Sequence, residues 1–197
     1  MKTDLRKIKS VKKIKDAFIS LHAREGYDGV TVSALCKEAG ISRGTFYAHY
    51  GNINDVLNDV MDEALDSTGK LWAKYLNIDQ DNLRNECAVP FCIFVRESKK
   101  YQKLFIDDNF SSMIVQKMVD RSFDVYYDYV SAHSDLTKEQ LKAIMGFQIS
   151  GCLSITKMGI RDGVKEWNCI RECIDKFVKS GIDSVVLQDD NEKNQEI

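Results

Sequence analysis

The sequence predicts an all-α fold, and three observations support that prediction. The chain of 197 residues contains a single proline, the residue that helix interiors tolerate least. Apolar residues recur at steps of three and four along much of the chain, which is the period of an amphipathic helix. We find no run of alternating β-branched residues bounded by turn signals, the pattern of a strand. With 44% hydrophobic residues, a chain of this length can bury a sizeable core.

The first helix is expected from about residue 4 to residue 24. Its apolar stripe consists of Leu5, Ile8, Val11, Ile14, Phe18 and Leu21. A second stripe, on the opposite side, is basic and consists of Lys2, Arg6, Lys9 and Lys13. Taken alone, the basic stripe is explained about equally well as a solvated face and as a surface for phosphates.

Glycines and capping residues then divide the chain into short helices. The segment EGYDG ends the first helix, and Thr31 or Ser33 can cap a second helix, VSALCKEA, over residues 32–39. Gly40 stands where a left-handed residue is needed to end it. Ser42 can cap a third helix, RGTFYAHY, of about two turns over residues 43–50.

A long fourth helix follows this segment. Gly51 ends the third helix, Asn52 caps the fourth, and the apolar period then runs from Ile53 to Leu76. We expect the domain boundary inside this helix, because no Gly-, Ser- or Pro-rich linker is present. Further helices are expected at about 81–97, 98–106, 109–132, 137–161 and 165–181, with Pro90 interrupting the first of them.

Composition excludes several classes of protein. No window approaches the roughly eighteen uncharged apolar residues of a membrane span, and the lysine-rich N-terminus lacks the apolar core of a signal sequence, so we expect a cytoplasmic protein. The six cysteines include no CxxC pair; we expect no disulfide framework, no metal and no cofactor. Cys169 and Cys173 are spaced for a soft metal, but no further ligand cluster accompanies them.

The net charge of −2 conceals an asymmetry. Residues 1–50 contain ten Lys or Arg and five Asp or Glu, which gives +5, so the other 147 residues carry −7. The basic end is where a polyanion would bind.

The second and third helices have the features of a helix-turn-helix, two short helices joined by a tight turn that contains glycine. Cys36 and Ala39 on the first of them are small, so the second can approach closely. Phe46 supplies the large apolar side chain that holds the second helix to the core.

One face of the third helix is free to meet a ligand. At about 100° per residue, this face carries Arg43, Gly44, Tyr47 and Ala48. The other side carries Thr45, Phe46 and His49. Arg43 suits a bidentate contact to guanine, Ala48 suits a thymine methyl group, and Gly44 permits close backbone approach. Nearby hydroxyls and open N–H groups suit phosphate oxygens.

Each of these residues also has a structural interpretation. A tyrosine such as Tyr47 or Tyr50 is as often half-buried packing as a ligand contact, and His49 is more simply a hydrogen-bonded structural histidine. No serine or cysteine nucleophile with a partnered acid is recognisable, so no catalytic residue and no enzymatic activity are expected.

Residues 18–57, FISLHAREGYDGVTVSALCKEAGISRGTFYAHYGNINDVL, resemble the DNA-binding domain of TetR-family transcriptional regulators. The resemblance rests on a helix ending in a glycine-tyrosine pair, a threonine opening the second helix and an alanine-glycine turn. It also rests on Ser42 followed by a basic residue and glycine, and on Thr45-Phe46-Tyr47. Together with the face described above, it gives as expected DNA-binding residues Thr31, Ser33, Ser42, Arg43, Gly44, Thr45, Tyr47, Ala48, His49, Tyr50, Asn52 and Asn54.

The resemblance implies an all-α homodimer that binds double-stranded operator DNA. Residues 1–51 would be the helix-turn-helix domain, 52–187 an effector-binding and dimerisation domain, and 188–197 a polar tail. The last two long helices would form the dimer interface. There Gly146 and Gly151 would allow close helix approach, although glycines in a helix can also mark crowding inside one monomer.

The sequence departs from the family pattern at two places. The family commonly carries a lysine that contacts phosphate, either at the position of Gly51 or at the second residue of the fourth helix, where this chain has Ile53. Asn52 and Asn54 replace that lysine only partly. Ala48 occupies a position often filled by an aromatic residue, which leaves Arg43 and Tyr47 as the main side chains for reading bases.

The leading hypothesis is a dimeric repressor released from its operator by a small-molecule effector. Aromatic and methionine residues between 91 and 147 provide material for an effector pocket, but such residues are more often core, and neither the pocket nor the effector is assigned. A small helical enzyme or lipid carrier is the alternative from another class, and an activator or a DNA binder without effector is a third.

Overall fold

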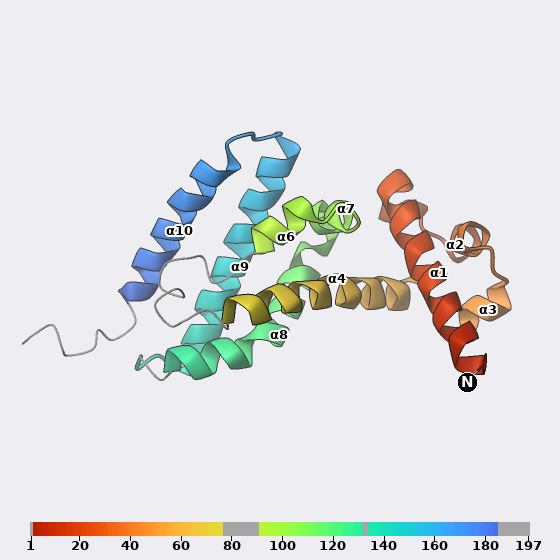
Figure 1. Cartoon of the computed structure of the whole chain (residues 1–197), viewed down its shortest axis with the longest axis horizontal. Helices are drawn as coiled ribbons and strands as arrows, with labels where there is room; N and C mark the ends of the chain where they lie inside the picture. The colour runs from red at the N-terminus through yellow and green to blue at the C-terminus, as the bar shows by residue number, and fades with distance from the viewer. Residues whose placement is uncertain (1, 77–90, 132–133, 185–197) are drawn as a thin grey trace, which may run out of the picture. The chain divides into compact units, whose positions relative to one another are not determined.

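The computed structural model describes residues 2–76, 91–131 and 134–184 (Figure 1). Across these ranges the chain forms α-helices and two short 3-10 helices and contains no strand, which confirms the predicted all-α class. Packing divides the chain into two units, Met1–Lys70 with Val95–Phe110, and Leu71–Phe94 with Ser111–Ile197. The division falls inside the fourth helix, but the first unit extends beyond residue 51 and takes in a later segment.

The N-terminal unit is built on four helices with a common core. They are α1 (Lys2–Glu25), α2 (Val32–Ala39), α3 (Arg43–Tyr47) and α4 (Ile53–Leu76), with the 3-10 helix η1 (Tyr27–Gly29) between the first two. Helix α2 packs against both α1 and α3, as Figure 1 shows. The side chains at the centre are fully or almost fully buried and include Ile14, Phe18, Leu35, Phe46, Val56 and Val60.

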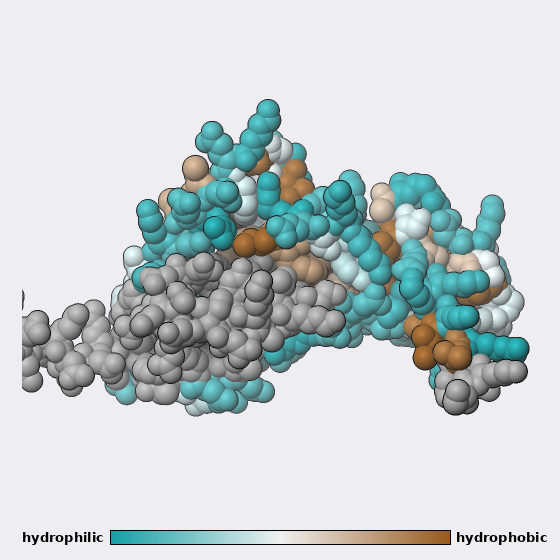
Figure 2. Space-filling view, viewed as in Figure 1, coloured by the Kyte–Doolittle hydropathy of each residue, from teal (hydrophilic) through white to brown (hydrophobic). Residues whose placement is uncertain are grey.

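The apolar stripe predicted on α1 is buried over only part of its length. Ile14, Phe18 and Leu21 lie in the core, whereas Leu5 and Ile8 are 56% and 64% exposed. Figure 2 shows the resulting hydrophobic patch near the N-terminal end of the helix. The periodicity was correct, but among the described residues the burial of α1 begins only at Ile14, because its first turns extend past the elements that cover the rest of it.

The segment Val95–Phe110 belongs to the first unit and packs on α1 through α7 (Gln102–Ile106). A helix was predicted here from residue 98, but Ser98 to Tyr101 form turns, and α7 starts only at Gln102. The segment is also attached by a buried polar contact, because His22 Nε2 lies 2.9 Å from Asp107 Oδ2. The imidazole ring packs beside Phe110, with ring centroids 5.5 Å apart.

The second unit contains α8 (Ser111–Ser131), α9 (Lys138–Arg161) and α10 (Trp167–Asp183), and α6 (Phe91–Glu97) begins in it. Helices α8 and α9 pack together. Each helix has a buried apolar stripe at helical spacing. The stripes are Ile114, Met118 and Phe123 on α8, and Leu141, Met145, Ile149 and Leu153 on α9. The predicted helices 109–132, 137–161 and 165–181 are therefore present, with ends shifted by about two residues. The predicted residues 81–90, including Pro90, and the tail 188–197 lie outside the described ranges.

Helix α9 alone, among the described helices, is long and apolar enough to cross a membrane by length and composition. Leu141, Met145, Ile149 and Leu153 of this helix are buried, and so is Lys157, whose Nζ lies 2.5 Å from Ser111 Oγ. One such helix is weak evidence for a membrane span.

Candidate nucleic-acid interface

The turn between α2 and α3 is built by local capping. Thr31 Oγ1 accepts a hydrogen bond from Ala34 N at 3.1 Å and starts α2. Gly40 ends α2 in the left-handed conformation, with φ of 63°, which an L-residue with a Cβ adopts at a cost. Ile41 N then donates to Cys36 O at 3.0 Å. Of the two residues predicted as possible caps of α2, Thr31 is the one that caps it.

Helix α3 is shorter than predicted. Ser42 Oγ accepts from Thr45 N at 3.0 Å and caps it, as expected. The helix ends at Tyr47 rather than at residue 50, because the chain tightens when His49 N donates to Phe46 O at 2.9 Å. The next N–H groups are taken by α4, since Asp55 Oδ2 accepts from Gly51 N and Asn52 N at 2.8 and 3.1 Å.

The two sides of α3 differ as the helical period predicted. Phe46 is fully buried and holds the helix to the core. The exposed side consists of Arg43, Gly44, Tyr47 and Ala48. Tyr47 is 59% exposed and packs edge-on against Phe46, with ring centroids 5.3 Å apart. An arginine and a tyrosine therefore project from a helix whose opposite side is fixed.

Gly44 has no structural reason to be glycine. Its φ is not positive, and a Cβ added there would meet only Ser42 Oγ at 3.7 Å, an ordinary van der Waals distance. The protomer therefore has room for a side chain at this exposed position.

Two residues on the other side of α3 are only half-buried. Thr45 Oγ1 lies 2.9 Å from Ser42 Oγ, so the two hydroxyls share a hydrogen bond. His49 has a buried Nδ1 with no hydrogen-bond partner among the described residues, which differs from the hydrogen-bonded structural histidine that its type suggested.

The expected phosphate-binding residues do not all remain available. Ser33 is exposed, and the oxygens of Thr31, Ser42 and Asn52 act as helix caps. Asn54 Oδ1 accepts from the hydroxyl of Tyr27. Ile53, at one of the two positions where the family commonly carries a lysine, is half-buried. These residues surround α3, but most of their acceptors are already used, which leaves their backbone and remaining donor groups for phosphate.

Tyr50 is not part of the exposed surface. It is 8% exposed, and its hydroxyl donates to Asp59 Oδ2 at 2.5 Å. Burial, followed by the hydrogen bond to the Asp59 carboxylate, raises the pKa of this phenol. The structure therefore gives Tyr50 a packing role, which was the structural alternative, and we leave it out of the interface proposed below.

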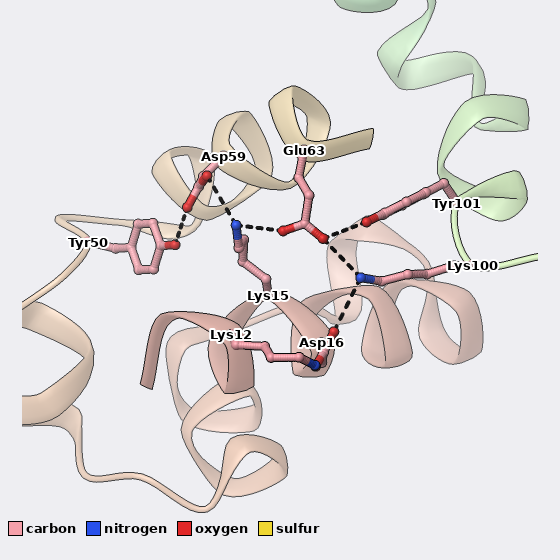
Figure 3. A network of polar contacts seen from close by, with 8 residues as sticks. All are labelled: Lys12, Lys15, Asp16, Tyr50, Asp59, Glu63, Lys100 and Tyr101. Atoms are coloured by element: carbon pink, nitrogen blue, oxygen red, sulfur yellow. Dashed lines mark hydrogen bonds and ion pairs between the residues drawn. The ribbon is translucent and has the colours of Figure 1, made fainter. Parts of the chain in front are cut away.

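The polar contacts that hold α1, α3 and α4 together were not predicted from the sequence (Figure 3). Asp59 on α4 also receives Lys15 Nζ at 3.4 Å, and the same ammonium lies 2.6 Å from Glu63 Oε2. The pKa of Lys15 is raised because these two carboxylates outweigh the effect of burial. Nothing in the sequence singles out these residues, because charged residues one turn apart on a helix are common on solvated faces.

The basic stripe on α1 is solvent-facing. Arg6, Lys9 and Lys13 are exposed and form no ion pair with another described residue, whereas Lys12 between them is paired with Asp16. Lys2 belongs to α1, but its side chain lies outside the described set. These three cations form no ion pair within the described part of the chain, and their exposed side chains can reach phosphate.

The geometry is that of a helix-turn-helix DNA-binding domain, with α3 as a capped recognition helix and exposed cations on α1. Residues 14–60 match the family described as bacterial regulatory proteins, tetR family. The match assigns a DNA-binding domain of the TetR type to residues 14–60 and supports a DNA-binding transcriptional regulator, as the resemblance implied. No curated protein matches the chain.

Proposed function

We propose that the protein is a dimeric repressor that binds an operator through α3 and is released from it by a small-molecule effector. The observation that carries operator binding is the two-sided character of α3, with Phe46 buried and Arg43 and Tyr47 exposed. A helix fixed on one side and polar on the other can enter the major groove and present an arginine to guanine. We propose no catalytic role and a cytoplasmic location.

The interface we propose has two parts with different tasks. Arg43, Tyr47 and Ala48, with Gly44 allowing close approach, read base edges. A surrounding set binds phosphates and consists of Thr31, Ser33, Ser42, Thr45, His49, Asn52 and Asn54 together with Arg6, Lys9 and Lys13. Contacts of the second kind position the domain and supply affinity for any sequence, whereas contacts of the first kind supply specificity.

The exposed faces of α9 and α10 support a homodimer. On α9, Phe147 and Met158 are 71% and 48% exposed. Between them lie Gly151 and Ser154, which are also exposed. A Cβ added at Gly146 or Gly151 would meet nothing within 4 Å, so crowding within the described protomer does not explain these glycines. On α10, Phe177 is 69% exposed. An apolar face with small residues at its centre fits a second copy of the chain.

In a dimer, two copies of α3 would read half-sites about one DNA turn apart, ~34–36 Å. An effector that binds better to a state with another spacing would release the protein, since only differential affinity for two states can shift their populations.

The cavity described in the second unit is too small for an effector. A cavity of about 20 Å³ lies between α9, α10 and Cys92 of α6, and this volume suits about one water molecule. Tyr101, Phe105 and Phe110, which the sequence suggested as pocket material, belong to the first unit. We therefore assign neither the effector nor its contacts.

A binding experiment tests the proposal. The protein is incubated at low salt with a DNA fragment from its own promoter region and with random duplex of equal length. Preference for the promoter fragment, lost in Arg43→Ala, is the expected result. Equal affinity for both fragments, unchanged by Arg43→Ala, would refute operator binding. A reporter gene under this promoter separates repression from activation, and thermal-shift screening of small molecules tests for an effector.

A further inference from the structure

A chain of polar contacts begins in the segment Val95–Phe110 and reaches α1 (Figure 3). Tyr101 donates its hydroxyl hydrogen to Glu63 Oε1 at 2.6 Å, and Lys100 Nζ donates to the same oxygen at 3.0 Å. The second carboxylate oxygen of Glu63 receives Lys15 Nζ at 2.6 Å. One carboxylate on α4 thus binds α1 on one side and the later segment on the other.

The same chain continues to the recognition helix. Lys15 also contacts Asp59 Oδ1, and Asp59 Oδ2 accepts from the hydroxyl of Tyr50. The backbone N–H of Tyr50 donates to Phe46 O at 3.0 Å, and Phe46 is the residue that fixes α3. Tyr101 and α3 do not share a contact, but they are joined through Glu63, Lys15, Asp59 and Tyr50 in succession.

Tyr101 and Lys15 are shielded from water, which strengthens their contacts, whereas Asp59 and Lys100 have side chains 41% and 45% exposed, where solvent screens ion pairs. Tyr101 is 6% exposed, and the side chain of Lys15 is 16% exposed. Burial alone would raise the pKa of Glu63, but its hydrogen bonds from Lys15, Tyr101 and Lys100 outweigh burial and lower that pKa to about 2. Lys12 with Asp16, by comparison, has side chains 73% and 42% exposed.

We propose that Tyr101 and Lys100 are positioning residues for DNA binding, which act through Glu63 and Asp59 on the segment that carries α3. Lys15 is shared between the two carboxylates. If Glu63 loses a donor from Val95–Phe110, Lys15 is drawn from Asp59 towards Glu63, and the support behind Tyr50 weakens. The inference rests on the proposed operator binding and extends the control of that site to residues outside 14–60. A displacement of Val95–Phe110 would then change the affinity of α3 for operator DNA.

The test uses full-length protein and four forms, wild type, Tyr101→Phe, Lys100→Met and Lys103→Met. Tyr101→Phe removes one hydroxyl and keeps the buried ring. Lys103→Met is the control for Lys100→Met, because Lys103 is an exposed lysine of α7 outside the contact chain, so the same charge is lost. The first measurement is amide hydrogen exchange of residues 42–50 without DNA. We expect exchange there to be ~3- to 10-fold faster in Tyr101→Phe and Lys100→Met and unchanged in Lys103→Met. This factor corresponds to the loss of part of the free energy of one hydrogen bond to a charged group.

The second measurement is affinity for a duplex that the wild type has selected from a random-sequence pool, compared with affinity for random duplex. We expect Tyr101→Phe to bind the selected duplex ~3- to 10-fold more weakly and random duplex within about twofold of wild type. A purely structural lesion would weaken both alike. In the double variant of Tyr101→Phe with Tyr50→Phe, the fold-loss of affinity for the selected duplex should be smaller than the product of the two single losses. Both substitutions act along one chain of contacts.

The inference is overturned if residues 42–50 exchange equally fast in Tyr101→Phe and Lys103→Met. It is also overturned if Tyr101→Phe loses affinity equally on both duplexes, or if its loss of affinity multiplies fully with that of Tyr50→Phe. If the wild type itself shows no preference for any duplex, the proposed operator binding fails instead. The exchange measurement, which contains no DNA, then decides the positioning role alone.

Discussion

The hydroxyl of Tyr50 donates to Asp59 at 2.5 Å, and this bond ties the segment after the recognition helix to α4. Tyr47, three positions earlier, is 59% exposed, whereas Tyr50 is 8% exposed. Two tyrosines in one short segment therefore have different roles. Tyr47 faces outwards, and Tyr50 holds the segment in place.

We expect Tyr50→Phe, but not Tyr47→Phe, to lower the stability of the fold. Tyr50→Phe leaves Asp59 with one donor fewer and should lower the free energy of unfolding by ~1–2 kcal/mol. Tyr47→Phe removes an exposed hydroxyl and should change the free energy of unfolding by less than ~0.5 kcal/mol, while it weakens DNA binding. Urea unfolding and a DNA titration of both variants check this. Equal destabilisation by the two substitutions would contradict the different roles.

The sequence predicted local features of the site well, because their causes are local. Thr31, Ser42 and Gly40 act within three or four residues of themselves, and Phe46 is placed inside by the helical period. The sequence did not predict that Tyr101 meets Glu63, because that contact spans 38 positions and nothing in the pattern says which carboxylate a buried tyrosine reaches. The exposure of Leu5 and Ile8 was not predicted for a related reason. Periodicity indicates a helix, but it does not show at which residue other elements begin to bury that helix.

Two glycines of the helix-turn-helix should respond differently to alanine. Gly40 has φ of 63°, so Gly40→Ala should destabilise the fold by ~1–2 kcal/mol. Gly44 lies in a helix with room for a Cβ, so Gly44→Ala should stabilise the fold by ~0.5–1 kcal/mol. If DNA approaches this face closely, Gly44→Ala will nevertheless weaken operator binding. A gain in thermal stability with unchanged DNA affinity would show that Gly44 is not at the interface.

Arg43 and the basic stripe should be separable by the salt dependence of binding. Arg43→Ala should cost ~1–3 kcal/mol on the preferred duplex and relax the preference at one base pair. Lys9→Ala should weaken binding to all duplexes alike and reduce the slope of log K against log salt by about 0.9 if Lys9 contacts one phosphate. Titrations on preferred and random duplexes at several salt concentrations measure both effects. Equal losses on the two duplexes for Arg43→Ala would place Arg43 among the phosphate contacts.

The proposed dimer face predicts that Gly151→Leu prevents dimerisation without unfolding the protomer. A side chain at Gly151 meets nothing within 4 Å in the protomer, but it would stand in the way of a closely approaching second helix. Analytical ultracentrifugation should show a dimer for the wild type and a monomer for Gly151→Leu, with unchanged helical circular dichroism. Gly151→Ala, with a much smaller side chain, should retain more of the dimer. A monomeric wild type would refute the dimer itself, and a fully dimeric Gly151→Leu would place the interface elsewhere.

The carboxylate of Glu63 should make stability depend on pH in the acid range. Its pKa falls from 4.5 to about 2 on folding, and a carboxyl with a lower pKa in the folded state stabilises the fold only where it is ionised. Its contribution is therefore complete above about pH 5.5 and is lost as the pH falls from about 4.5 towards 2. Because the side chain is 35% exposed, solvent screening reduces this contribution to ~1–2 kcal/mol.

Glu63→Gln should be less stable than the wild type by that amount at pH 7, and the difference should shrink steadily in urea unfolding curves recorded from pH 5 to pH 3. Glu97→Gln, the same change at an exposed residue of α6, serves as the control for net charge. A stability difference for Glu63→Gln that stays constant over this range would mean that Glu63 contributes through packing and not through its charge.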